Sequence, residues 1–367
     1  MPRDTSQESA RNIVFFKWYH ANIVKYGLFP ACISERTSYF CTMEKSNIQR
    51  IHELADQVIG GGTISFEDAE WLSAQGGDTE REALCEASHR ITRSLARRDF
   101  DMCSIVNAKS GLCPENCSWC AQSSHHKTGI KVYGLISEEE CLKCARESEA
   151  FGFRRFSIVT SGRKPNQQEL GRICGMVKHL KENTGISLCA SLGLLDKDSL
   201  VALKNSGVSR YHCNLETSAS YFGKLCTTHT HHQKLETLCA AAEAGLETCS
   251  GGIIGMGESM KQRIELAFEL RELNVESIPL NILHPIAGTP LADCTPLSED
   301  EILVTIALFR FINPSAYLRL AGGRSSLSLS FFEKALHAGI NAAIMGSMLT
   351  TAGSDVNEEM KIIAGNH

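Results

Sequence analysis

Short apolar runs alternate with amphipathic stretches over most of the chain, beginning near residue 101. The apolar runs have the length of buried strands, and we expect strands near 102–107, 154–160, 187–191, 209–214, 247–254, 277–283, 316–320 and 341–345. The longer stretches repeat apolar residues at helical spacing and include 137–150, 167–183, 231–244, 259–272 and 299–312. Strands that alternate with helices favour a parallel sheet, and about eight such units favour closure into a barrel. We therefore predict an α/β fold, a (βα)8 TIM-type barrel.

The chain before the barrel has a different pattern. From Ser46 to about Arg98 the spacing is helical, with one apolar stripe through Ile51, Leu54, Ala55 and Val58. Ser65 followed by Asp68 is typical of the start of another helix. Residues before Met43 show no clear periodicity. We expect a flexible extension over 1–42, a helical segment over 43–100, the barrel over 101–355 and a C-terminal tail over 356–367.

The composition of the chain argues against several classes of function. The chain has 367 residues, of which 43% are hydrophobic and 22% charged, and its formal net charge is −5 without any run of Lys or Arg. A nucleic acid or an acidic membrane surface is therefore not expected as a partner. No apolar run approaches the roughly 18 residues that span a bilayer, and none near the N-terminus is long enough for a secretory signal. We expect a cytoplasmic protein.

Cysteine is unusually frequent, with 16 in the chain. In a reducing compartment many cysteines indicate metal ligation, catalysis or core packing. The strongest pattern is Cys113, Cys117 and Cys120, a C-x3-C-x2-C spacing in the loop after the first expected strand. Three thiolates this close can hold three corners of a [4Fe–4S] cluster, which leaves one iron open to a ligand from outside the protein. A zinc site completed by His125 or His126 is the alternative, because structural zinc usually takes four protein ligands.

This loop resembles the signature of the radical S-adenosylmethionine (SAM) superfamily. Further segments resemble, in the same order, those of the biotin synthase family: NAKSGLCPENCSWCAQSSHHKTG, YHCNLETSASYF, CSGGIIGMGES, SIPLNILHPIAGTPL and YLRLAGGR. The resemblance covers roughly residues 47–355. It implies a complete (βα)8 barrel, a sulfurtransferase that converts dethiobiotin to biotin in the last step of biotin biosynthesis, and a homodimer. It also implies that SAM is cleaved to a 5′-deoxyadenosyl radical with an electron from a flavodoxin- or ferredoxin-type donor.

The same resemblance implies roles for individual residues. Cys113, Cys117 and Cys120 would ligate the [4Fe–4S] cluster, and Trp119 would lie beside the adenine of SAM. Asn214 and Glu216 match positions that contact the SAM ribose, although the better-known members have Asp where this chain has Glu216. Asn281 matches the position that binds the ureido ring of dethiobiotin, and its alternative reading, as for Asn214, is strand-end hydrogen bonding. No side chain is expected to be catalytic, because the radical comes from the cofactor.

The sequence departs from the family at the ligand positions of an auxiliary cluster. The better-known members hold a sulfur-donating [2Fe–2S] cluster with three cysteines and one arginine, of which Cys189, Cys249 and Arg319 are matched here. Ser157 occupies the remaining cysteine position, and a serine oxygen is a poor ligand for iron. We expect a rearranged cluster, either [2Fe–2S] or a larger cubane type, bound by Cys189, Cys213, Cys226 and Cys249. The cysteines interpreted as packing or surface positions are Cys85, Cys103, Cys174, Cys239 and Cys294.

Two competing functions follow from the same residues. One is another radical SAM enzyme of similar barrel design, of the hydrogenase maturase or methylornithine synthase type. The other is a non-catalytic iron–sulfur protein, against which the expected SAM-contacting residues at strand ends argue.

Overall fold

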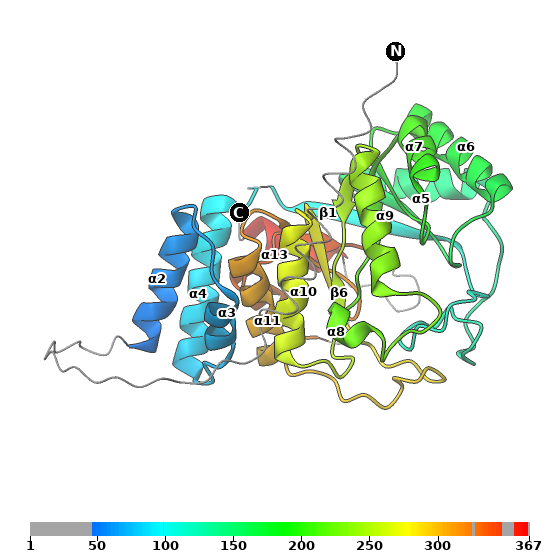
Figure 1. Cartoon of the computed structure of the whole chain (residues 1–367). Helices are drawn as coiled ribbons and strands as arrows, with labels where there is room; N and C mark the ends of the chain where they lie inside the picture. The colour runs from blue at the N-terminus through cyan, green and yellow to red at the C-terminus, as the bar shows by residue number, and fades with distance from the viewer. Residues whose placement is uncertain (1–45, 98, 325–326, 347–355, 366–367) are drawn as a thin grey trace, which may run out of the picture. The chain divides into compact units, whose positions relative to one another are not determined.

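The computed structural model describes residues 46–97, 99–324, 327–346 and 356–365. The expected extension over 1–42 lies outside the described residues. The described chain forms a parallel barrel that helices surround (Figure 1).

The expected barrel is confirmed, with strand bounds close to those expected from the sequence. In chain order the strands are β1 (Asp101–Lys109), β2 (Arg155–Thr160), β3 (Ser187–Ser191), β4 (Val208–His212), β5 (Glu247–Cys249), β6 (Gly252–Ile254), β7 (Ser277–Ile282), β8 (Tyr317–Leu320) and β9 (Ala342–Ile344). Neighbouring strands pair in parallel, β1 pairs with both β2 and β9, and a β5–β7 pairing closes the circle. Since β5 and β6 are two parts of one interrupted strand, these segments make an eight-stranded barrel.

Tight backbone contacts explain the glycines at that interruption. A Cβ on Gly251 would lie 2.0 Å from the carbonyl oxygen of Pro279, and one on Gly252 would lie 2.6 Å from that of Glu216. Only glycine allows the neighbouring strands to approach this closely. These two glycines therefore serve the packing of strand against strand.

Most of the helices that follow the strands begin at an N-cap side chain that accepts a hydrogen bond from the first turn. In chain order the helices are α5 (Glu138–Ala150), α6 (Gln167–Asn183), α7 (Lys197–Ser206), α8 (Ala219–Phe222), α9 (His231–Glu243), α10 (Met260–Glu272), α11 (Glu299–Ile312), α12 (Leu329–His337) and α13 (Val356–Gly365). Asn166 and Thr230, for example, form capping boxes that satisfy the first backbone N–H groups of α6 and α9. The sequence pattern indicated five of these helices within one residue at each end. The segment expected as a C-terminal tail contains α13.

Three helices before the barrel cover one of its sides. They are α2 (Asn47–Ile59), α3 (Phe66–Ser73) and α4 (Asp78–Leu95). In Figure 1, α3 and α4 lie beside α10 and α11, and α2 packs against α4. The Ser65 cap and its capping box with Asp68 start α3 as the sequence indicated. Ser88 on α4 donates to the carbonyl oxygen of Ala338 at 2.6 Å, which joins this helical segment to the end of α12.

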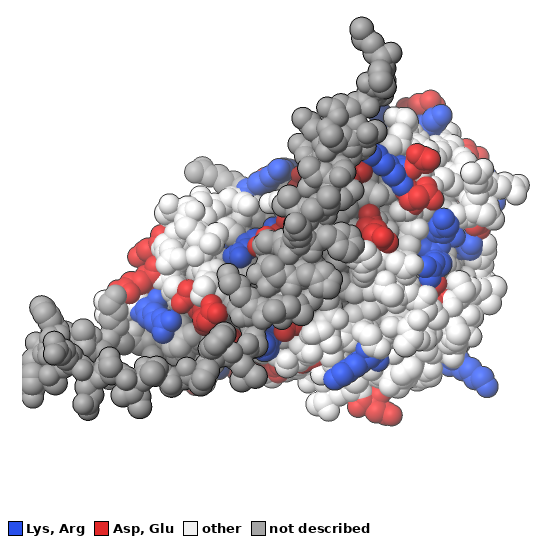
Figure 2. Space-filling model, viewed as in Figure 1, with Lys and Arg blue, Asp and Glu red and all other residues white. Residues whose placement is uncertain are grey.

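Charge on the face shown in Figure 2 is mixed, with Lys and Arg interspersed among Asp and Glu. Among the described residues, no helix combines the length and the apolar character needed to cross a bilayer.

Candidate active site

A cavity of about 430 Å³ opens at the carboxyl ends of the strands, where barrel enzymes place their chemistry. Most of the site residues expected from the sequence line this cavity. They are Cys113, Cys117, Trp119, Cys120, Cys213, Asn214, Glu216, Cys249, Asn281 and Arg319, and Ser157 lies among them. The structure thus brings together residues that are separated by about two hundred positions in the chain.

The three-cysteine loop follows β1 and is held by its own backbone. The N–H of Cys113 donates to the carbonyl oxygen of Gln122 at 3.0 Å, and the N–H of Cys120 donates to that of Cys117 at 3.0 Å. Gln122 also accepts from the N–H of Gly111, whose φ of 81° favours glycine. Cys113, Cys117 and Cys120 are all free thiols on the cavity wall. This donor set suits a [4Fe–4S] cluster with one iron left for SAM.

Two histidines after the loop contact its backbone. His125 Nε2 lies 3.0 Å from the carbonyl oxygen of Pro114, and His126 Nε2 lies 3.0 Å from that of Cys117. One nitrogen of each ring is therefore engaged by a carbonyl group instead of a sulfur. This arrangement favours the cluster over the zinc alternative.

Cys226 lies against this same loop. Cys117 Sγ donates to Cys226 Sγ at 3.7 Å, and Cys226 Sγ lies 3.3 Å from His229 Nδ1. The hydrogen bond from Cys117 is the main reason why the pKa of Cys226 falls to about 3, and it raises the pKa of Cys117 together with burial. Among the described residues, one group of three thiol, imidazole or carboxylate side chains is close enough to bind a single metal ion. It consists of Cys117, Cys226 and His229.

A buried carboxylate orders the segment that carries Cys226. Glu115 accepts from Thr228 Oγ1 at 2.6 Å and from Arg163 at 3.2 Å, and its Oε2 lies 2.5 Å from His229 Nδ1. Burial opposes ionisation of Glu115, but these hydrogen bonds hold its pKa below the ordinary value. The loop and the segment 225–229 therefore form one hydrogen-bonded unit.

Asn214 and Glu216 follow β4 and are linked by a buried lysine. Lys234 Nζ donates to the carbonyl oxygen of Asn214 at 2.8 Å and lies 3.7 Å from Glu216 Oε1. Burial raises the pKa of Glu216, while the Lys234 charge opposes that shift. Glu216 has a φ of 71°, and its N–H donates to the carbonyl oxygen of Gly251 at 3.0 Å. Lys234 is a positioning residue that the sequence reasoning missed, because nothing in its local pattern marks it.

Asn281 and Trp119 lie on other parts of the cavity wall. Asn281 Nδ2 donates to the carbonyl oxygen of Gly252 at 3.1 Å, and its Oδ1 accepts from the N–H of Gly322 at 3.0 Å. An amide has two donor hydrogens and two acceptor lone pairs, so one of each is left for a ligand in the cavity. Trp119 packs against the buried cluster of Leu225, Met256 and Leu283.

The barrel interior beneath this cavity is charged. Asp101 accepts from Arg319 at 2.6 Å and from Arg210 at 3.2 Å, and Arg155 lies 3.5 Å away. Burial alone would raise the pKa of Asp101, but the three guanidinium groups hold it below the ordinary value. The same charges act with burial to lower the pKa of His212 to about 3, which keeps this imidazole neutral.

The four thiols expected to bind the auxiliary cluster are not brought together. Cys226 lies against the three-cysteine loop, as described above. Cys213 borders the cavity near Lys234 and Glu216, and it directly follows His212, so the two side chains point to opposite faces of the strand. The expectation for Cys213 and Cys226 stays a prediction, and the position of Cys226 beside Cys117 does not favour it. Cys189 and Cys249 remain inside the barrel with Arg319, and the sequence reasoning missed that Cys103 is buried there too.

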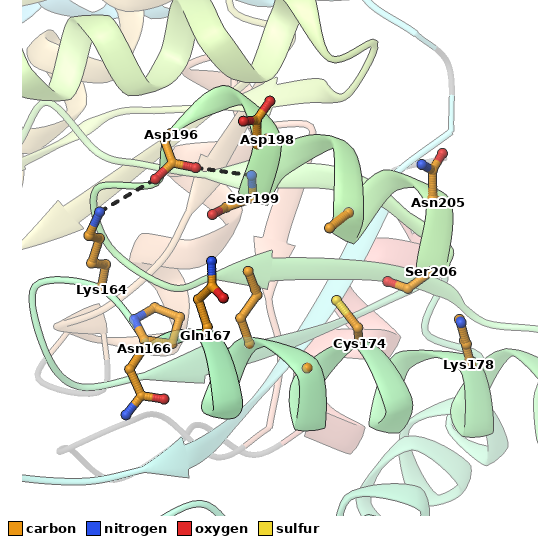
Figure 3. A pocket seen from close by; sticks show the side chains of 14 residues that line it. Lys164, Asn166, Gln167, Cys174, Lys178, Asp196, Asp198, Ser199, Asn205 and Ser206 are labelled. Atoms are coloured by element: carbon orange, nitrogen blue, oxygen red, sulfur yellow. Dashed lines mark hydrogen bonds and ion pairs between the residues drawn. The ribbon is translucent and has the colours of Figure 1, made fainter.

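A larger hollow of about 750 Å³ lies outside the barrel between α6 and α7 (Figure 3). Its charged groups serve local structure, since Asp196 pairs with Lys164 at 3.4 Å and caps α7 by accepting from the N–H of Ser199. It contains Cys174 but none of the other cysteines. We therefore assign the chemistry to the smaller cavity inside the barrel.

Comparisons with known proteins agree with this site. Residues 109–270 match the Radical SAM superfamily, and residues 279–366 match the Biotin and Thiamin Synthesis associated domain. Biotin synthase from Porphyromonas gingivalis is 50% identical over 312 residues, which cover 85% of this chain and 94% of that protein. Biotin synthase from Acetivibrio thermocellus is 48% identical and covers 83% and 94% of the two chains.

Solved structures show the same fold at lower identity. Methylornithine synthase superimposes with a TM-score of 0.71 at 20% identity, covering 79% of this chain and 85% of that one. The FeFe-hydrogenase maturase from Carboxydothermus hydrogenoformans gives a TM-score of 0.73 at 14% identity, covering 86% and 78%. These likenesses concern the barrel alone. The sequence identity over most of both chains places this chain in the biotin synthase family of radical SAM enzymes.

Proposed function

We propose that this chain converts dethiobiotin to biotin with SAM and two iron–sulfur clusters. The observation that carries the proposal is a single cavity that holds the three-cysteine loop at its mouth, Asn281 on its wall, and Cys249 and Arg319 in its depth, with Cys189 buried near Cys249 inside the barrel. A cluster that cleaves SAM and a cluster that donates sulfur would thereby share access to one substrate.

The residues at the mouth have binding and positioning roles. Cys113, Cys117 and Cys120 hold the [4Fe–4S] cluster, which when bound with SAM supplies the radical that removes hydrogen from the substrate. Trp119 contacts the adenine, and Asn214 and Glu216 bind the ribose. The hydrogen bond from Lys234 to the backbone of Asn214 orients that pair.

Asn281 binds the substrate. Its amide keeps one donor and one acceptor free, which matches the N–H and C=O groups of a ureido ring. The two backbone bonds that fix the amide plane reduce the entropy lost when the ring is bound.

The depth of the cavity holds the auxiliary cluster, [2Fe–2S] or a larger cubane type, which when bound supplies the sulfur atom. Cys189, Cys249 and Arg319 are proposed ligands. The proposal also includes a flavodoxin- or ferredoxin-type electron donor, a homodimer and a cytoplasmic location, where a reducing environment keeps the cysteines free.

Anaerobic reconstitution with iron and sulfide tests this function. Reduced enzyme given SAM and dethiobiotin should form biotin and consume about two SAM for each biotin, because two carbon–hydrogen bonds are broken. SAM cleavage that does not respond to dethiobiotin would contradict the proposal and favour a radical SAM enzyme of the maturase or methylornithine synthase type.

A further inference from the structure

The side chain of Cys103 points into the barrel. Asp101, two residues earlier on β1, reaches Arg319 of β8 and Arg210 of β4, which is possible only across the barrel interior. Ile105, two residues later, lines the cavity. Because alternate residues of a strand share a face, Cys103 faces the interior as well. It is 1% exposed.

The strand register places Cys103 in one layer of side chains with Cys189. Strands of such a barrel are tilted, so the residues of one layer come from alternate strands and advance by two positions at each step. Cys103 pairs with Arg155 on β2, and Arg155 pairs with Ser187 on β3. Two positions beyond Ser187 is Cys189.

The same step closes the layer around the barrel. Applied to the registers of the remaining strands, it leads from Cys189 to Cys249, from Cys249 to Arg319, and from Arg319 back to Cys103. One complete layer therefore consists of three cysteines and one arginine. That is the composition of the ligand set that the family resemblance implied.

Hydrogen bonds tie this layer together. Cys249 Sγ donates to Ser277 Oγ at 3.4 Å, and Arg319 Nε donates to the same hydroxyl oxygen at 3.4 Å. Arg319 also donates to the backbone carbonyl oxygen of Asp101 at 2.9 Å, directly before Cys103 on the inner face. The arginine thus links the strand of Cys249 to that of Cys103.

Buried charges lie directly below the layer. Arg155, Arg210 and Arg319 face the carboxylates of Asp101 and Glu247, so cationic groups outnumber anionic ones. Arg319, itself a member of the layer, joins the layer to these buried charges through Asp101.

Ser157 belongs to the next layer and has no bonding partner there. It pairs with Ile105 on β1 and with Cys189 on β3, so its side chain stands one step above Cys103 on the adjoining strand. It is 1% exposed, and its Oγ has no hydrogen bond among the described residues. The thiol missing at Ser157 is thus present one strand away and one layer lower.

We propose that Cys103 supplies the third thiolate ligand of the auxiliary cluster, together with Cys189, Cys249 and Arg319. The inference deepens the proposed function and rests on it. The relocated thiol explains how a chain with Ser157 retains three cysteines around one interior site.

Iron and acid-labile sulfide counts on the reconstituted full chain test the ligand. The Cys103→Ala protein should hold about four irons, those of the loop cluster, while the wild type holds about six or eight depending on the auxiliary cluster type. Cys141→Ala is the matched control, because Cys141 is equally buried but packs in α5 outside the strands, and its iron content should equal that of the wild type. Adding Ser157→Cys to Cys103→Ala should restore auxiliary iron, since it returns a thiol to the family's position.

Each result separates the ligand from the function. Full auxiliary iron in Cys103→Ala would overturn the inference, as would loss of auxiliary iron in Cys213→Ala but not in Cys103→Ala. If the wild type forms biotin while Cys103→Ala keeps its iron, the inference fails and the proposed function stands. If auxiliary iron depends on Cys103 but the wild type forms no biotin, the proposed function fails and the ligand stands.

Discussion

The loop with Cys113, Cys117 and Cys120 and the layer with Cys103, Cys189, Cys249 and Arg319 both gather thiols, but by different means. The loop places its cysteines by short sequence spacing and by hydrogen bonds to its own backbone and to the segment 225–229. The layer takes one residue from each of four strands and owes its geometry to the register of a closed barrel. A local motif can therefore be recognised in a linear sequence, whereas a layer emerges only once the strands are paired.

The two regions also differ in the solvent exposure of their thiols. The loop thiols are partly exposed at the cavity mouth, whereas Cys103, Cys189 and Cys249 are fully buried below it. Under the proposed function, SAM and an electron donor need access to the first site, and a sulfur reserved for the substrate needs shielding from water. The comparison predicts that changes in one region leave the other intact.

The largest expected effect comes from the loop. Replacing Cys113, Cys117 and Cys120 together by Ala should abolish formation of 5′-deoxyadenosine with dithionite, because no ligands remain for the cluster that binds SAM. The auxiliary iron should persist. Residual 5′-deoxyadenosine at the wild-type rate would show that the cluster assignment is wrong.

The next effect concerns the floor below the layer. Asp101→Asn should lower the free energy of unfolding by about 3–5 kcal/mol, because it leaves buried guanidinium groups without their carboxylate. Urea unfolding of the protein without iron measures this, with Asp198→Asn on the exposed rim of the outer hollow as the control. Equal midpoints for Asp101→Asn and the wild type would contradict the role of the charge network.

The stability difference between the wild type and Asp101→Asn should depend on pH, in a direction that follows from the pKa of Asp101. The pKa of Asp101 is lower in the folded protein than in the unfolded chain, where it is about 3.9. Its stabilising contribution is therefore complete above about pH 4–5 and disappears as the pH falls through the folded-state value. The stability gap between the wild type and Asp101→Asn should shrink in acid, and a gap that widens on acidification would refute the assignment.

A smaller effect is expected on the cavity wall. Asn281→Ala should weaken dethiobiotin binding by about 1–3 kcal/mol, the usual cost of losing a buried hydrogen-bond partner. Calorimetric titration with dethiobiotin measures this, and Asn205→Ala in the outer hollow serves as the control. Unchanged affinity in Asn281→Ala would show that the amide of Asn281 joins strand ends but does not bind dethiobiotin.

The smallest effect on auxiliary iron is expected for Cys226. Its sulfur contacts Cys117, so Cys226→Ala should leave auxiliary iron at the wild-type level and alter only the electron paramagnetic resonance signal of the loop cluster. A loss of about two or more auxiliary irons would instead restore Cys226 as a ligand of the deeper site.

The success of sequence reasoning follows the same division. The short apolar runs along the chain indicated all eight strands, because a strand that is buried on both faces has an apolar sequence. The loop cysteines were recognised by their spacing. Cys103 was interpreted as a packing or surface position, because burial among apolar neighbours looks alike on both faces of a strand, and the ligand role proposed for it rests on the strand register. Cys213 and Cys226 were assigned from nearness to a strand end, which does not say which face a side chain occupies. For Cys103, only the pairing of β1 with its neighbouring strands shows that it shares a layer with Cys189 and Arg319.

The most direct test isolates the layer from the loop. In the Cys113/Cys117/Cys120→Ala protein, all bound iron belongs to the auxiliary site, so ⁵⁷Fe Mössbauer spectra report that site alone. Adding Cys103→Ala to this variant should remove the remaining cluster spectrum, whereas adding Cys141→Ala should leave it unchanged. A cluster spectrum that survives the loss of Cys103 would contradict the account.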